Sequence, residues 1–187
     1  MPENMPLKAP DAANLYEAAM NHMARYAATE AGLARVLAQR IERWGHKQAE
    51  LAEPEDLATQ IRRAKAEIPG VLARLKELGV LNDTAFAASR AKRLTKSGKS
   101  RRATLAHLAA KGIQGPALAD DPQRELAAAC AYLRRRRAGP YGDAPPAKIL
   151  AAMARGGFAQ SIAQQALALD REAADAAIRS LEQETLS

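Results

Sequence analysis

The chain has 187 residues, of which 48% are apolar and 26% are charged, a balance typical of a soluble globular protein rather than a disordered one. It contains 45 Ala but only 16 Val, Ile and Thr residues together. Because Ala favours helices and β-branched residues favour strands, the composition excludes a large β-sheet and predicts an all-α fold. The net charge of +7 favours an acidic partner, such as nucleic acid or an acidic protein.

The ends and the single cysteine predict a cytoplasmic protein. Residues 1–11 contain Pro and acidic residues where a signal peptide would have basic and then apolar ones, so we expect a flexible N-terminus there. No apolar run approaches the ~18–20 residues of a membrane span. Cys130, the only cysteine, lies in an apolar run that predicts burial and excludes an internal disulfide.

The first helices are predicted from apolar periodicity and capping residues. The spacing predicts a helix over 12–27 with Tyr26 on its apolar face, and Thr29 is a plausible N-cap of a second helix that carries Leu33 and Ile41. About 26 additional residues separate this helix from the next one, which begins near Val71. Their apolar spacing predicts an added helix that starts at Pro54.

Glycines and capping residues divide the middle and end of the chain. Gly79 is expected to end the helix that begins near Val71, with Leu78 on the inner face. Asn82 and Ser100 are plausible N-caps of the next two helices. Further helices are predicted over 123–137, from Pro146 to the Gly156-Gly157 pair, around Ile162, and in a C-terminal segment, 170–187, whose net charge is −3.

The chain contains an internal repeat. The segment HLAAKGI, which ends at Ile113, recurs as AMARGGF, which ends at Phe158, a shift of 45 residues. Such a period predicts stacked helical repeats, here three tandem three-helix repeats with a weak third helix in the second, where GPALADD is interrupted by Gly-Pro. The expected division is a flexible N-terminus (1–11), repeat 1 (12–81) with an insertion at about 44–69, repeat 2 (82–121), repeat 3 (122–169) and an acidic amphipathic tail helix (170–187).

No pattern in the sequence indicates an enzyme. His22, His46 and His107 are far apart and have no partner at metal-ligand spacing. The string SGKS, from Ser97 to Ser100, lacks the first glycine of a phosphate loop and follows a predicted helix rather than a strand, so a turn followed by an N-cap explains it. We expect no catalytic residue, metal or cofactor.

The candidate binding site is a basic block. From residue 90 to 137 the chain has 13 basic and 3 acidic residues, a net charge of +10. Cations in the first turn of a helix oppose its dipole, which favours an anion visiting the turn near Ser100. We expect these cations to surround an exposed turn, while a run of four arginines ends a later helix. The candidate residues are Arg90, Arg93, Lys96, Lys99, Arg101, Arg102, Lys111, Arg134, Arg135, Arg136 and Arg137.

The central segment, VLARLKELGVLNDTAFAASRAKRLTKSGKSRRATLAHLAAKGI, resembles the central block of the bacterial RecX regulatory proteins. That family's pattern is a short helix, a Gly and an apolar residue, Leu-Asp-Asp, an aromatic residue, a basic helix, a Gly turn and a helix ending in Lys-Gly-Ile. Asn82 replaces the first Asp. The residues that fit in order are Leu81, Asp83, Phe86, Arg90, Gly98, Arg102, Leu105, Leu108, Lys111, Gly112 and Ile113.

The resemblance implies a non-enzymatic modulator, usually an inhibitor, of the RecA recombinase in DNA repair, recombination and the SOS response. Members form an elongated, curved array of three repeats that lies in the groove of the recombinase–DNA filament. A monomer that touches the filament, and the DNA phosphate backbone with it, is therefore expected. Two alternatives stay open: a sequence-independent DNA-binding protein that uses the basic block, and a helical scaffold for another acidic protein.

Overall fold

The computed structural model describes residues 8–115 and 118–183, and every regular element in these ranges is helical. This confirms the all-α class. The helices are α1 (Ala12–Met23), α2 (Glu30–Gln48), α3 (Pro54–Ala66), α4 (Ile68–Glu77), α5 (Asp83–Lys96), α6 (Arg101–Ala110), α7 (Pro122–Arg136), the 3₁₀-helix η1 (Gly139–Tyr141), α8 (Pro146–Arg155), α9 (Gln160–Ala168) and α10 (Arg171–Gln183).

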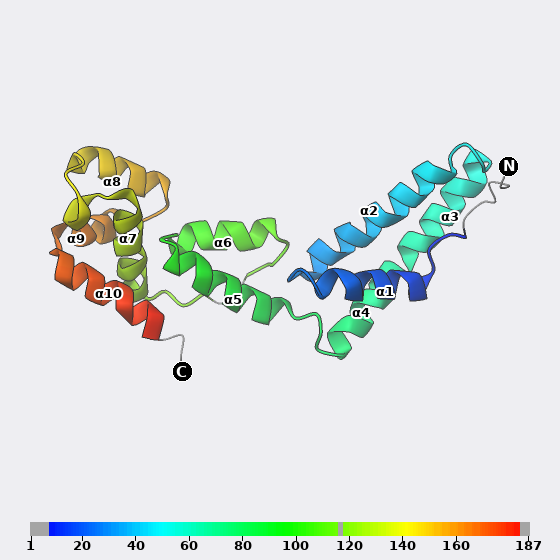
Figure 1. Ribbon diagram of the computed structural model, residues 1–187, viewed down its shortest axis with the longest axis horizontal. Coiled ribbons are helices and arrows are strands. Elements are labelled where there is room, and N and C mark those ends of the chain that lie inside the picture. Colours follow the sequence, from blue (N-terminus) through cyan, green and yellow to red (C-terminus); the bar gives the residue numbers. More distant parts are fainter. Residues whose placement is uncertain (1–7, 116–117, 184–187) are drawn as a thin grey trace. The chain divides into compact units, whose positions relative to one another are not determined.

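The chain divides into two compact units, and the boundary between Phe86 and Ala87 falls inside α5. In unit 1, α2 packs against α3 and α4, and α1 packs against α2 and α4 (Figure 1). Its core is built from fully buried leucines at helical spacing, such as Leu33 and Leu37 of α2, together with Leu75 of α4. The predicted added helix is α3, which begins at Pro54 as expected.

Side-chain caps fix where helices α2 and α5 begin. Thr29 Oγ1 accepts a hydrogen bond from the Gly32 N–H at 3.0 Å, and Asn82 Oδ1 accepts one from the Ala85 N–H at 2.9 Å. Such caps satisfy N–H groups that have no partner inside the helix, each contributing about 1 kcal/mol. Both predicted N-caps are confirmed.

Two apolar side chains predicted to face inward in unit 1 are exposed. The helix expected over 12–27 ends at Met23, and the Arg25 N–H bonds the His22 carbonyl three residues back in the turn that follows. Tyr26 therefore lies outside the helix with 62% of its surface exposed. Leu78 is 58% exposed because it is the C-cap of α4, where the chain turns away before Gly79.

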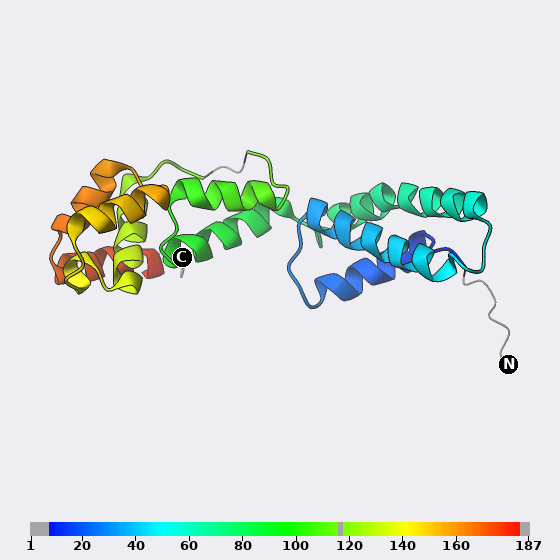
Figure 2. The ribbon, with the colours of Figure 1, turned by 90° about the horizontal axis from the view of Figure 1, so that it is seen from above.

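Unit 2 is organised around α7. The side chains of 127–131 are almost completely buried, because residues of α8, α9 and α10 pack around this helix (Figure 2). A helix that is apolar all round is one that other helices cover. Its alanines let neighbouring backbones approach closely. Cys130 is buried in this run, as predicted.

The acidic C-terminal helix contributes to the core of unit 2. Ile178 and Leu181 of α10 are 3% and 5% exposed, and α10 packs on α7. Full burial of such side chains contributes about 1.5–3 kcal/mol each. The Tyr141 hydroxyl donates to Asp175 Oδ1 at 2.7 Å, which ties η1 to the same helix. Its acidic residues thus lie on a helix that is anchored by its apolar face.

The two sequence segments related by a shift of 45 residues have the same local structure. The ends of α6 and α8 are both followed by a left-handed glycine, Gly112 (φ 87°) and Gly157 (φ 90°). The next residue donates its N–H back to a carbonyl of the helix in each case, from Ile113 to Leu108 and from Phe158 to Met153, both at 3.1 Å. This bond pattern is a Schellman motif.

The second predicted repeat contains two helices in the described residues, α5 and α6, which run side by side (Figure 1, Figure 2). The expected short third helix is absent from residues 114, 115 and 118–121; the rest of GPALADD, residues 116 and 117, lies outside the described part. Of the predicted N-terminus and tail helix, residues 1–7 and 184–187 lie outside it too.

Across the described ranges, no helix combines the length and apolar character needed to cross a membrane.

Candidate functional site: a basic cleft in unit 2

The turn between α5 and α6 docks directly on α7. Gly98 adopts φ 77°, and a Cβ atom at this position would lie 2.6 Å from the Tyr132 backbone nitrogen. Only glycine allows this approach, because it combines left-handed backbone with the absence of a side chain. Arg135 Nη1 donates to the Ser97 carbonyl at 2.6 Å and joins the same two segments. The SGKS string is therefore a turn and an N-cap, as predicted.

Ser100 joins the start of α6 to the end of α8. Its hydroxyl accepts from the Ala103 N–H at 3.1 Å and donates to the Gly156 carbonyl at 2.6 Å. The side chain is fully buried. One hydroxyl thus caps one helix and satisfies a terminal carbonyl of another, which holds the two helix ends together.

These contacts form a cleft of about 380 Å³ lined by four cations. Lys99 comes from the α5–α6 turn, Arg135 and Arg136 come from the last turn of α7, and Arg155 ends α8. No Asp or Glu of the described residues lines it. The cleft is therefore suited to an anionic group such as a carboxylate or a phosphate.

Aromatic rings form the apolar part of the cleft. Tyr132 and Phe158 meet edge to face, with ring centroids 5.6 Å apart. The Arg136 guanidinium lies 5.1 Å from the Tyr132 ring centroid. Such contacts orient the cation and limit the entropy it loses on binding an anion.

The comparisons with known proteins identify the family. Over 169 residues the chain is 32% identical to a Myxococcus xanthus (strain DK1622) protein named "Regulatory protein RecX", and the match covers 82% of this chain and 83% of that relative. The chain belongs to the RecX family. No family model matches it. No solved structure matches it.

Three of the candidate cations predicted for this RecX family member line the cleft: Lys99, Arg135 and Arg136. Arg102 extends to the end of α8, where its Nη2 donates to the Ala154 carbonyl at 3.3 Å. The two basic clusters that are separated in the sequence, the α5–α6 turn and the arginine run, therefore meet in one place.

Two predicted site residues form hydrogen bonds to other segments of the chain and do not line the cleft. Arg101 is half-buried, and its Nε and Nη2 donate to the Leu118 carbonyl at 3.1 and 3.0 Å. Arg90 donates from Nε to His107 Nε2 at 3.0 Å, which links α5 to α6. The expectation that all the cations around this turn are exposed is wrong for this pair, because both side chains satisfy polar groups of neighbouring segments.

The anion expected at the start of α6 is supplied by the chain itself. Glu125 Oε2 of α7 accepts from the Arg101 N–H at 2.9 Å. A carboxylate at this position satisfies a free N–H group and complements the helix dipole. The first turn of α6 is therefore occupied, and ligand binding is expected in the cleft instead.

Glu125 gives a testable pH dependence. Its burial raises the pKa of this carboxyl above the usual 4.5, although the hydrogen bond from Arg101 opposes the shift. A folded-state pKa above the unfolded value gives stability that is present at low pH and is lost as pH rises through the raised pKa. Urea titrations at several pH values would measure the free energy of unfolding of the wild type and of Glu125→Gln. We expect the wild-type value minus the variant value to decrease as the pH rises. A difference that grows with pH would contradict this account.

The other predicted cations do not line the cleft. Lys96 is partly buried, whereas Arg93, Lys111, Arg134 and Arg137 are exposed. Arg137 adopts left-handed backbone (φ 50°) and ends α7 in a position that glycine usually occupies. Of the four consecutive arginines, 134 to 137, only Arg135 and Arg136 line the cleft.

Arg155 and the aromatic pair were not among the predicted site residues. In the repeated pattern, Arg155 of AMARGGF corresponds to Ala110 of HLAAKGI, 45 residues earlier. A cation that occurs in one copy of a repeat and not in the other is a sign of specialisation, and this signal could have found Arg155. Tyr132 and Phe158 are far apart in the sequence, and only the tertiary packing of unit 2 brings them together.

Cys130 does not line the cleft. Burial, and secondarily the Asp175 carboxylate, raises the pKa of its thiol to about 11. A thiol with such a pKa is protonated near neutral pH and is a poor nucleophile. No group of three or more potential metal ligands occurs within residues 8–115 and 118–183.

Proposed function

We propose that this protein regulates the RecA recombinase by binding the recombinase–DNA filament, and that the effect is inhibitory. Membership of the RecX family, with a relative named as a regulatory protein, supports a regulatory role. The observation that carries the proposed binding mode is the cleft with four cations and, among the described residues, no lining carboxylate. A cationic cleft can bind either a DNA phosphate or an acidic side chain of the recombinase.

The cleft binds one anionic group of the filament. All four cations of the cleft are exposed and available to contact that group. Arg135 and Arg136 are held in place by the Ser97 carbonyl and the Tyr132 ring. Charge-assisted hydrogen bonds of this kind contribute about 1.5–3 kcal/mol each. These two contacts orient Arg135 and Arg136 for the anion, and Lys99 and Arg155 add further cationic contacts.

The proposal includes the repeat architecture, with three repeats over 12–81, 82–121 and 122–169. The Schellman motifs that end both α6 and α8 support this division for the second and third repeats. Repeat proteins present long surfaces that suit an extended partner. In this proposal the protein acts in the cytoplasm as a non-enzymatic monomer without a cofactor, in DNA repair, recombination and the SOS response.

One binding experiment separates this proposal from direct DNA binding and from scaffolding. Fluorescence anisotropy would measure the affinity of the labelled protein for recombinase filaments on DNA, for the same DNA alone and for the recombinase alone, at equal salt. We expect the filament to bind most tightly. Equal affinity for naked DNA that is lost in Lys99→Glu/Arg155→Glu would favour a DNA-binding protein that uses the basic block, and no affinity for filaments would favour a scaffold for another partner.

A further inference from the structure

A second basic pocket, in unit 1, lies between α1 and α2 and has no part in the proposed function. Its volume is about 870 Å³, within the ~300–1,000 Å³ of small-molecule sites. It contains Trp44, the only tryptophan of the chain. We propose that this pocket binds single-stranded nucleic acid, with a base stacked on Trp44 and the phosphates held by Arg40, Arg43 and Lys47.

The helical register places the required groups on one face. Arg40, Arg43, Trp44 and Lys47 follow one another at intervals of three, one and three residues along α2, so they share one side of the helix. Arg40 and Lys47 are seven positions apart, which is about 10 Å along the helix axis. This length accommodates successive phosphates of a single strand that follows α2.

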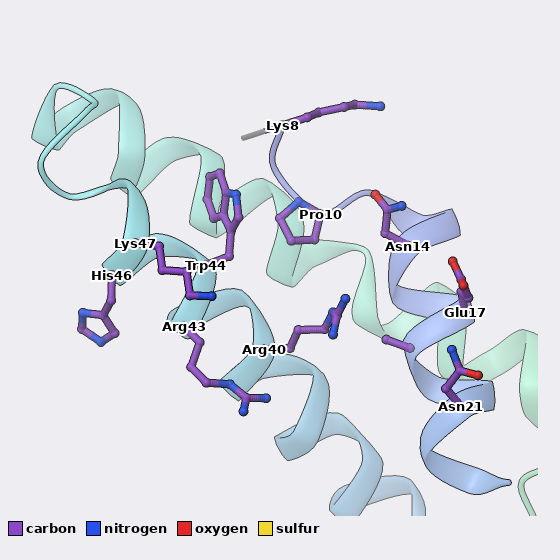
Figure 3. A pocket seen from close by; sticks show the side chains of 11 residues that line it. Lys8, Pro10, Asn14, Glu17, Asn21, Arg40, Arg43, Trp44, His46 and Lys47 are labelled. Carbon is purple, nitrogen blue, oxygen red and sulfur yellow. The ribbon is translucent and has the colours of Figure 1, made fainter. Parts of the chain in front are cut away.

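Figure 3 shows how these side chains are arranged. Arg40 and Arg43 extend from α2, and Arg40 points toward α1, while the Trp44 indole lies near the ring of Pro10. The three cations on α2 are exposed, and the indole is partly buried. A partly buried ring has a fixed orientation and still offers a surface on which a base can stack.

The chemistry of the opposite wall favours nucleic acid over an acidic peptide. Asn14 and Asn21 of α1 line the pocket with Glu17, its only lining carboxylate among the described residues. Asparagine amides can donate to and accept from base edges. The Asn14 oxygen already accepts from the Asp11 N–H at 3.4 Å, so its NH₂ group is the part that would meet a base. An acidic peptide would use the cations but would gain little from a tryptophan beside two amides. Aromatic stacking combined with a basic groove is typical of single-strand binding.

Trp44 provides a specific probe, because its fluorescence is the only indole signal of the chain. We would titrate the full chain, without recombinase, with a ten-residue oligo-dT and separately with oligo-U. We expect either strand to quench Trp44 emission, and high salt to reverse the quenching. Tighter binding of one oligonucleotide would identify DNA or RNA as the preferred strand. A ten-residue Glu peptide should leave the emission unchanged.

The variant Arg40→Gln/Arg43→Gln should lower oligonucleotide affinity roughly tenfold or more. The slope of log K against log salt should decrease by about 1.4, or about 0.7 for each lost phosphate contact. The matched control is Arg35→Gln/Arg62→Gln, which removes two exposed cations of unit 1 that do not line this pocket. It should retain most of the affinity.

Trp44→Ala should weaken binding roughly 5- to 150-fold by anisotropy, and Trp44→Phe should restore most of it, because both aromatic rings stack on bases. Melting curves would verify that each variant is folded. Three results would overturn the proposal: no binding of either oligonucleotide, equal affinity of the Arg40→Gln/Arg43→Gln variant, or displacement of the oligonucleotide by the Glu peptide at equal concentration. None of them bears on filament binding by unit 2.

Discussion

Replacing Gly98 with alanine is expected to destabilise unit 2 by about 2–5 kcal/mol. Left-handed backbone costs a non-glycine residue about 1–2 kcal/mol. The new methyl group would also lie 2.6 Å from the Tyr132 nitrogen and 2.7 Å from its Cα atom, both of them backbone atoms of α7. Backbone cannot rotate away as a side chain can, so the α5–α6 turn must separate from α7, and overpacking of this kind adds about 1–3 kcal/mol. Urea unfolding followed by circular dichroism would measure the loss.

Gly79→Ala is the matched control for this prediction. Gly79 has φ 68°, but a Cβ atom there would meet nothing within 4 Å. Its replacement should cost only the ~1–2 kcal/mol of the backbone conformation. The difference between the two variants isolates the close approach to α7. If Gly98→Ala costs no more than Gly79→Ala, the described docking of the turn is wrong.

Reversing two charges in the cleft should nearly abolish filament binding. Lys99→Glu/Arg155→Glu places two carboxylates where an anion is proposed to bind. Each lost charge-assisted hydrogen bond costs about 1.5–3 kcal/mol, so affinity should fall about a hundredfold or more. Both side chains are exposed, and surface changes usually alter stability by only about 0.5 kcal/mol. Anisotropy with recombinase–DNA filaments would measure the affinity, and a melting curve the stability.

The control variant is Lys148→Glu/Arg179→Glu, which makes the same change in net charge at two exposed cations of unit 2 outside the cleft and outside the candidate basic block. Its affinity should fall much less. An equal loss in the two double variants would mean that filament binding follows net charge and does not use the cleft. Unchanged affinity in both would remove the basic block from the proposed interface.

Local features of the fold were predictable because they depend on neighbouring residues. Thr29, Asn82 and Ser100 were recognised as N-caps, since a cap bonds an N–H group three residues away. The related ends of α6 and α8 were visible as a repeated pattern of apolar residues before glycine. These signals fix helix starts and ends, and they established the all-α class.

The candidate site was predicted only in part, because it depends on contacts between distant residues. Arg101 counted as an exposed cation because nothing nearby in the sequence reveals its bonds to Leu118, 17 residues away. Likewise Arg135 reaches Ser97 across 38 residues. The basic block was therefore located, but the sequence could not separate the cations that hold helices together from those that line the cleft.

Trp44 illustrates the same limit in unit 1. The sequence shows one tryptophan among basic residues, but the pocket also requires α1, whose Asn14 and Asn21 form the opposite wall. The helix face was predictable from spacing, whereas its partner across the pocket was not.

The most direct test of the central claim is DNA strand exchange by the cognate recombinase, measured against increasing concentrations of this protein. We expect the wild type to inhibit the reaction, Lys148→Glu/Arg179→Glu to inhibit it at similar concentrations, and Lys99→Glu/Arg155→Glu not to inhibit it while remaining folded. Strand exchange that is unaffected by the wild type, or is inhibited equally by the cleft variant, would contradict that claim.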